Sequence, residues 1–276
     1  MVICATRSGI FAVVTSPATL RQRMRRSGRV LLAAIWTVPC YLTWAGGALL
    51  TLPFRPAARR WNSLTILTWS SGLLVIFGIR IVISGKAPAP PFFLVANHLS
   101  YLDILVLGST LGATFISKHD IRGWPVLGHL ARVTGTIFVN RERRRDAIRV
   151  LREIDRAWDE GAGIVLFPEG TSSRGDRIYP LKSALLEWAV RQEQPVHAAA
   201  LRYETGDPEA PADEVVCWWG DVGFGDHASR LLVLPRVEAR ITFHAHPAME
   251  SDRNLLAELL HNRLSEIHQP SGPAGG

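Results

Sequence analysis

The sequence has 276 residues, of which 47% are hydrophobic and 20% charged, with nine tryptophans. A chain of this length can bury a sizeable core, so a disulfide-stapled miniprotein is excluded, and the composition is too apolar for a disordered protein. Cys4, Cys40 and Cys217 lie far apart, which argues against a disulfide framework and against a cysteine-rich zinc site. The composition therefore predicts a folded protein with some membrane contact.

The net charge of +7 is distributed unevenly along the chain. Residues 1–102 contain eleven Lys and Arg residues and no Asp or Glu, a net charge of +11, whereas the remainder has 20 basic and 24 acidic residues, a net charge of −4. The basic residues flank uncharged apolar segments, which favours anionic lipid as the partner and argues against nucleic acid. Residues 1–29 are predicted to be a basic N-terminal segment.

Residues 30–84 are predicted to form a membrane helical hairpin. Residues 30–52 carry no charge and would span about 35 Å as a helix, enough to cross the hydrocarbon core of a bilayer. Residues 61–79 form a second uncharged run, which is weaker because six Asn, Ser and Thr residues dilute it. The connection, residues 53–60, contains three arginines and is too short to be a domain.

A hairpin returns the chain to the side of the membrane from which it started. The arginine-rich N-terminus and the residues after the hairpin would therefore share one side, which their positive charge marks as the cytoplasmic face. A hairpin that crosses the bilayer and one that dips into a single leaflet give the same orientation, so both remain open.

Residues 85–268 are predicted to form an α/β domain, because short apolar runs alternate with helical patterns. Strands are expected at residues 91–96, 133–139, 163–167, 196–201 and 238–245. Helices are expected at residues 147–158, around residues 181–188, and after Ser251, which is expected to cap the last helix. The tail, residues 269–276, is predicted to be disordered.

The first candidate site follows the strand expected at residues 91–96. This strand runs directly into Asn97 and His98, and Asp103 lies five residues after the histidine. If His98 lies in the turn and Asp103 in the first turn of the next helix, the carboxylate can hold the imidazole, which can then take a proton from a hydroxyl. The alternative is a helix-start capping box formed by Ser100 and Asp103, in which the carboxylate binds an amide.

Two further polar segments also follow expected strands. Residues 167–175 contain Gly170, which permits unusual backbone angles, and three hydroxyl side chains with Arg174, which offer donors to an anion. Residues 135–141 end in Arg141 and lead into more arginines, a cationic cluster suited to a phosphate. The alternatives are a polar strand-to-helix loop and a solvated helix start.

These three segments, in this order, resemble the motifs of the phospholipid/glycerol acyltransferase family, and in particular of the 1-acylglycerol-3-phosphate acyltransferases. The matched positions are Asn97, His98 and Asp103 in the first motif, Gly135, Ile137, Phe138 and Arg141 in the second, and Phe167 to Thr171 in the third. The resemblance covers residues 85–205 and implies a mixed β-sheet flanked by helices.

The resemblance also implies an activity, the transfer of a fatty acyl group from a thioester to the free hydroxyl of a lysophospholipid at the membrane. His98 would be the general base and Asp103 its partner, and the oxygen of the acceptor would be the nucleophile. The implied substrate-binding residues are Asn97, Arg141, Glu169, Gly170, Thr171 and Arg174. The acyl donor would be acyl-CoA or an acyl carrier protein thioester, with no metal and no other cofactor.

Two positions depart from the pattern of the family. Ser172 stands where many members have arginine, and Ala198 where the fourth motif has proline. These departures leave lyso-ornithine lipid as an alternative acceptor, and a catalytically silent lipid-binding protein and a thioester hydrolase as rival functions. Outside the motifs, His244 and His246 alternate on an expected strand, where a surface pair is favoured over a two-ligand metal site.

Overall fold

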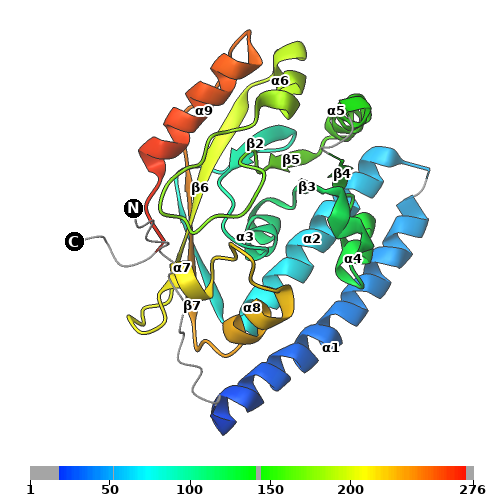
Figure 1. Cartoon of the computed structure of the whole chain (residues 1–276). Coiled ribbons are helices and arrows are strands. Elements are labelled where there is room, and N and C mark those ends of the chain that lie inside the picture. Colours follow the sequence, from blue (N-terminus) through cyan, green and yellow to red (C-terminus); the bar gives the residue numbers. More distant parts are fainter. Residues whose placement is uncertain (1–18, 52, 141–143, 272–276) are drawn as a thin grey trace, which may run out of the picture.

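The computed structural model of the chain describes residues 19–51, 53–140 and 144–271. Within these residues a seven-stranded sheet forms in the order β1-β7-β6-β2-β5-β3-β4 (Figure 1). Strand β7 pairs antiparallel with β6 and parallel with β1, and all pairs from β6 to β4 are parallel. The strands are β1 (Ile79–Ser84), β2 (Phe92–Ala96), β3 (Thr114–Lys118), β4 (Ile137–Val139), β5 (Gly163–Leu166), β6 (Val196–Glu204) and β7 (Val237–Phe243).

Helices cover both faces of this sheet (Figure 1). The α-helices are α1 (Leu20–Thr51), α2 (Arg55–Phe77), α3 (Leu102–Leu111), α4 (Leu127–Val133), α5 (Arg144–Asp159), α6 (Glu187–Arg191), α7 (Ala212–Val215), α8 (Phe224–Leu231) and α9 (Arg253–Ile267). Two 3-10 helices are η1 (His119–Gly123) and η2 (Ser183–Leu185). The mixed sheet flanked by helices is therefore confirmed.

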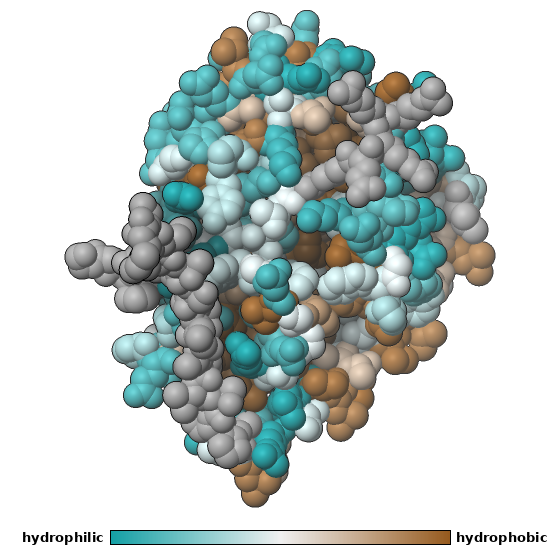
Figure 2. Space-filling model, viewed as in Figure 1, coloured by the Kyte–Doolittle hydropathy of each residue, from teal (hydrophilic) through white to brown (hydrophobic). Residues whose placement is uncertain are grey.

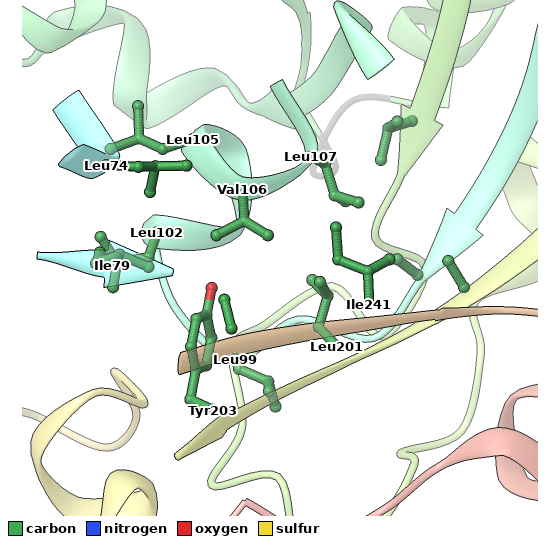
Figure 3. Close-up of a cluster of buried hydrophobic side chains, with 14 of the residues drawn as sticks. Leu74, Ile79, Leu99, Leu102, Leu105, Val106, Leu107, Leu201, Tyr203 and Ile241 are labelled. Atoms are coloured by element: carbon green, nitrogen blue, oxygen red, sulfur yellow. The ribbon is translucent and has the colours of Figure 1, made fainter. Parts of the chain in front are cut away.

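Two hydrophobic cores lie on opposite faces of the sheet, because alternate residues of a strand point to opposite sides. In the central strand β2, which is buried throughout, Leu94 packs with α2 and α3, whereas Val95 packs with α5, α6 and α9. Figure 3 shows the first of these cores, in which side chains of α3 lie beside Leu201 and Ile241 of the sheet. The turn that follows β2 is thus supported from both faces.

The predicted helical hairpin is formed by α1 and α2, which pack against one another. Among the described residues, α1 is the one helix long and apolar enough to cross a membrane. In α2, Asn62 Nδ2 donates to Thr134 O at 2.7 Å, and Ser63 Oγ donates to Gly112 O at 2.6 Å. Polar residues that dilute the second apolar run therefore bond this helix to the domain.

Tryptophans of one hairpin helix lie over glycines of the other. A Cβ atom added at Gly47 would lie 1.9 Å from the ring of Trp61, and one added at Gly72 would lie 2.2 Å from the ring of Trp36. The absence of a side chain at these two positions lets the helices approach closely, so the hairpin packs as a rigid pair.

Both ends of the hairpin contact the domain. Near the start of α1, Arg29 NH1 donates to Leu234 O at 2.6 Å. Near the turn, Arg59 forms an ion pair of 2.6 Å with Glu160, which follows α5. A hairpin that crosses the bilayer would carry its turn about 30 Å away from a domain on the entry side. These contacts show that the hairpin lies along the domain at both of its ends.

The boundaries of the hairpin differ from those expected. Arg55, Arg59 and Arg60 lie in the first turns of α2 and not in the connection, because Pro56 at the helix start has no amide to satisfy and its fixed φ suits a helix. Residues 79–84, which the sequence pattern assigned to the hairpin, are strand β1 and pair with β7. The first ten residues of α1 belong to the segment expected to precede the hairpin, and Thr19 bonds Gln22 at its start.

Three expectations within the domain are corrected. Asp252, and not Ser251, caps α9, because its side chain accepts from the amides of Asn254 and Leu255. The strand expected at residues 133–139 begins only at Ile137, since α4 extends to residue 133. The helix expected around residues 181–188 is divided into η2 and α6.

The tail expected to be disordered begins with ordered residues. Ser271 is 3% exposed, accepts from Tyr203 N at 3.1 Å and donates its own amide to Gly175 O. Residues 272–276 lie outside the described residues.

Replacing Arg29 with methionine is expected to lower the melting temperature of the purified protein. The side chain is buried and donates to the carbonyl groups of Leu232, Leu234 and Pro235 after α8. Loss of hydrogen bonds from a charged group costs about 1.5–3 kcal/mol, a fall of several degrees in Tm. Scanning fluorimetry in detergent should detect this fall, and Arg21→Met, at an exposed position of α1, should leave Tm almost unchanged. Equal Tm values for both variants would contradict the assignment.

Candidate functional site

The candidate site lies at the carboxyl end of β2, where residues 97–101 lead into α3. Asp103, in the first turn of α3, is fully buried. Its Oδ2 accepts from His98 Nδ1 at 2.7 Å, from Leu99 N at 2.7 Å and from Ser100 N at 3.0 Å. The predicted contact between Asp103 and the imidazole is therefore confirmed. The same oxygen also accepts from backbone amides, as the alternative of a helix-start capping box predicts. The capping box itself is only half formed, since the Ser100 hydroxyl has no partner in the described part of the chain.

The second oxygen of Asp103 is bound by a residue that the sequence analysis missed. Tyr203 in β6 is buried and donates its hydroxyl to Oδ1 at 2.7 Å, and Figure 3 shows this hydroxyl directed toward α3. Burial, and after it the charge of Asp103, raises the pKa of Tyr203 well above its usual value, so the hydroxyl keeps its proton and donates. A tyrosine inside a buried strand needs a polar partner, which is the signal that could have identified it.

The imidazole of His98 is held on two sides. Its Nδ1 donates to Asp103, and its ring stacks on the ring of Phe167, with centroids 4.4 Å apart and planes inclined by 22°. With the proton on Nδ1, the lone pair of Nε2 is free to accept. The side chain is 24% exposed, and Nε2 has no partner among the described residues. The ring can therefore take a proton from a hydroxyl that approaches from solvent.

Two residues expected to bind substrate instead hold the turn that carries His98. The Asn97 amide donates to Leu201 O at 3.0 Å and accepts from Leu201 N at 2.7 Å, which fastens the end of β2 to β6. Glu169 accepts from His98 N at 3.2 Å and from Tyr179 N at 3.1 Å, and is 3% exposed. Burial raises the pKa of Glu169 to about 7, against the lowering effect of the two amides. Both side chains therefore position the turn and do not face solvent.

Serine residues of the third segment add to this support. Ser173 donates its amide to His98 O at 2.8 Å. The Ser172 hydroxyl donates to Trp218 O, which joins the segment to the region between α7 and α8. The hydroxyls expected to offer donors to an anion are thus engaged with backbone carbonyls at these two positions.

The remaining residues of the third segment differ in their environments. Gly170 has the positive φ expected of it, 78°, and Thr171 is exposed. Arg174 donates Nε to Asp213 at 2.7 Å, and its guanidinium lies 5.7 Å from the ring centre of Trp219. Arg174 is therefore ion-paired to a buried carboxylate, while its side chain remains 45% exposed.

Arg141 lies outside the described residues, but the structure gives the position of the strand that precedes it, β4. Strand β4 is at the edge of the sheet, separated from β2 by β5 and β3. With neighbouring strands about 4.8 Å apart, the carboxyl ends of β2 and β4 lie about 14 Å apart along one edge of the sheet. A substrate that contacts both His98 and the residues after β4 must extend along this edge.

His244 and His246 follow β7, which ends at Phe243, and do not alternate on a strand as expected. His244 Nε2 lies 3.1 Å from Glu266, and its Nδ1 accepts from His246 N at 3.2 Å. Among the described residues there is no group of three or more His, Cys, Asp or Glu side chains that could hold a metal ion.

Comparison with known proteins finds relatives of this chain. A family model described as Acyltransferase matches residues 79–202. The chain is 31% identical to the 1-acyl-sn-glycerol-3-phosphate acyltransferase of Neisseria meningitidis, over 71% of this chain and 77% of that protein. It is 34% identical to the lyso-ornithine lipid O-acyltransferase of Brucella abortus, over 70% of this chain and 78% of that protein.

A solved structure shares the fold. The 1-acyl-sn-glycerophosphate acyltransferase PlsC from Thermotoga maritima superposes with a TM-score of 0.59 at 20% sequence identity. The superposition covers 88% of this chain and 98% of that one, so it extends beyond the sheet to the helices around it.

Replacing Tyr203 with phenylalanine is expected to destabilise the protein. Oδ1 of Asp103 would remain buried without a donor, which costs about 1–3 kcal/mol. Tyr41→Phe is a matched control, because its hydroxyl contacts His129 at an exposed position and its loss should cost little. Urea unfolding followed by tryptophan fluorescence should give a lower midpoint for Tyr203→Phe than for Tyr41→Phe. Equal midpoints would show that the Asp103 carboxylate does not need this donor.

Proposed function

This chain belongs to the acyltransferase family that includes the 1-acyl-sn-glycerol-3-phosphate and lyso-ornithine lipid acyltransferases, and from this membership we propose its acceptor and mechanism. The chain is an acyltransferase. We propose that it moves a fatty acyl group from a thioester to the free hydroxyl of 1-acylglycerol-3-phosphate, giving phosphatidic acid. The observation that carries the mechanism is the His98 ring, whose Nδ1 is held by Asp103 while the side chain remains 24% exposed.

In the proposed reaction the acceptor supplies the nucleophile. His98 Nε2 takes the proton from the acceptor hydroxyl as its oxygen attacks the thioester carbonyl. The carbon–sulfur bond then breaks, and the protonated ring returns the proton to the leaving thiolate. Asp103 keeps the ring in one orientation and stabilises its positive charge between the two steps.

The negative oxygen that develops during attack needs donors near His98. Glu169 bonds the third segment to the His98 amide, which supports a role near His98 for the two residues that follow it, Gly170 and Thr171. We assign the stabilisation of the oxyanion to donors of this segment. The thiol of the donor would belong to coenzyme A or acyl carrier protein, and no metal or other cofactor takes part in these steps.

The choice of acceptor depends on positive charge near the carboxyl edge of the sheet. The arginines that follow β4, beginning with Arg141, suit a phosphate monoester. Lyso-ornithine lipid is the second candidate, because Arg174 is neutralised by Asp213 and Ser172 stands where many members have arginine. The catalytic domain is proposed to act at the cytoplasmic face, where basic residues of α1 meet anionic lipid.

Replacing His98 with alanine is expected to lower kcat by about 10²–10⁴-fold, because the general base is lost. Asp103→Asn should cost less activity, since the base itself remains. Transfer of radiolabelled acyl groups by purified, membrane-inserted protein would measure both changes. Near-normal turnover of His98→Ala would exclude the mechanism, and hydrolysis of the thioester at the same rate with and without acceptor would favour a hydrolase.

Replacing Arg141 with alanine tests the acceptor. Loss of a charge-assisted contact to phosphate is expected to raise KM for 1-acylglycerol-3-phosphate about tenfold or more and to leave KM for the acyl donor almost unchanged. Arg236→Ala, at an exposed arginine just before β7, serves as the control. If the wild-type enzyme acylates lyso-ornithine lipid well and 1-acylglycerol-3-phosphate hardly at all, the acceptor assignment is wrong while the chemistry of His98 stands.

A further inference from the structure

A short apolar segment projects from the surface between η1 and α4. Pro125, Val126 and Leu127 are exposed, Val126 by 70%. The backbone of Val126 has φ of 60°, in the left-handed region that a β-branched residue rarely adopts. A strained and exposed valine adds nothing to the core, and strain of this kind gathers at functional surfaces. We call residues 124–127 the apolar tip.

The surroundings of the apolar tip are basic. Asp120 is the one acidic residue in the segment 118–133. The exposed residues that carry or can acquire positive charge there are Lys118, His119, Arg122, His129 and Arg132. An apolar segment surrounded by basic residues fits a bilayer that contains anionic lipid. The apolar side chains can enter the headgroup region while the basic side chains bind lipid phosphates. The same basic residues argue against a groove of a partner protein as the binding site, because the cores of protein interfaces are depleted of charged residues.

Helix α4, whose first residue Leu127 belongs to the apolar tip, contacts α1. The Tyr41 hydroxyl of α1 lies 3.0 Å from Nε2 of His129 in α4. Exposed hydrophobic residues recur along α1 at the spacing of one helical face, and they are Leu31, Ile35, Val38, Leu42 and Leu49. Figure 2 shows hydrophobic residues gathered along the lower right edge of the molecule, where α1 lies in Figure 1. A membrane that covers this face of α1 can therefore also meet the tip.

Trp124 connects the apolar tip to the turn at the carboxyl end of β2. Its ring makes edge contacts with Trp218 and Phe224, at centroid distances of 6.1 and 5.4 Å. Both rings contact Tyr101, at 5.7 and 4.9 Å, and Trp218 N donates to Leu99 O at 2.7 Å. The position of the tip in a bilayer would therefore set the height of this turn above the lipid.

We propose that the apolar tip is a second membrane contact, which inserts into the headgroup region of an anionic bilayer beside α1. Insertion holds the His98 turn at the depth of an acceptor hydroxyl, so that the acyl chains of the acceptor need not leave the membrane. The contact is separate from the hairpin and does not depend on which lysolipid is acylated.

Spin labels measure the insertion depth directly. Val126→Cys and the control Leu255→Cys would be labelled in a Cys4→Ser, Cys40→Ser background, in which Cys217 is buried and unreactive. Leu255 is exposed at the start of α9, which packs on the other face of the sheet from the hairpin. The full chain would be reconstituted in vesicles of phosphatidylglycerol and phosphatidylethanolamine.

The expected result is a label at position 126 that collides severalfold more with oxygen, and severalfold less with a water-soluble nickel chelate, than the label at position 255. The position 255 label should behave like one in water. Equal accessibility at the two positions would overturn the proposal. The measurement needs no acyl transfer, so its outcome is independent of the proposed function.

Acyl transfer provides a second readout. Val126→Asp is expected to lower kcat/KM for an acceptor embedded in vesicles about tenfold, because the burial of one valine changes an equilibrium by about that factor. The same ratio for a short-chain acceptor dissolved in water should be unchanged, and Leu255→Asp should change neither. Equal loss with both acceptors, or no loss with either, would count against insertion of the tip.

Discussion

The carboxylate of Asp103 joins the parts of the chain that must meet for the site to exist. It accepts hydrogen bonds from the His98 ring, from two amides of the turn after β2 and from Tyr203 of β6. A charged group with no exposed surface is stable only when several donors replace its water, and these four do so. The orientation of the imidazole therefore depends on the sheet order that places β6 next to β2.

Most motif side chains around this carboxylate form hydrogen bonds with backbone atoms. Asn97 binds both polar atoms of the Leu201 peptide unit, Glu169 binds the His98 amide, and Ser173 binds the His98 carbonyl. Such contacts fix the turn at several points, which keeps the open nitrogen of the ring at one place relative to the third segment. Polar residues that hold a turn belong to the same residue types as those that bind a substrate, so a motif alone does not separate the two roles.

The predicted membrane hairpin packs into the folded domain and contributes to its core. Its second helix contributes Leu73 and Leu74 to the core that also contains α3, and Arg59 of the same helix is ion-paired to Glu160. A displacement of the hairpin would therefore reach the site through these packed contacts. On the other side of the site, Arg174 is ion-paired to Asp213 of α7.

Local properties of the chain were sufficient to predict the α/β alternation, the apolar helix and the contact between His98 and Asp103, because periodicity and a five-residue spacing across a turn involve only neighbouring residues. They failed for β1, assigned to the hairpin, and did not identify Asp213 as the partner of Arg174. They also missed Tyr203, which lies 100 residues from its partner. These outcomes depend on contacts between distant segments, and a polar side chain acquires its partner only when the sheet order and the packed helices bring that partner within hydrogen-bond distance.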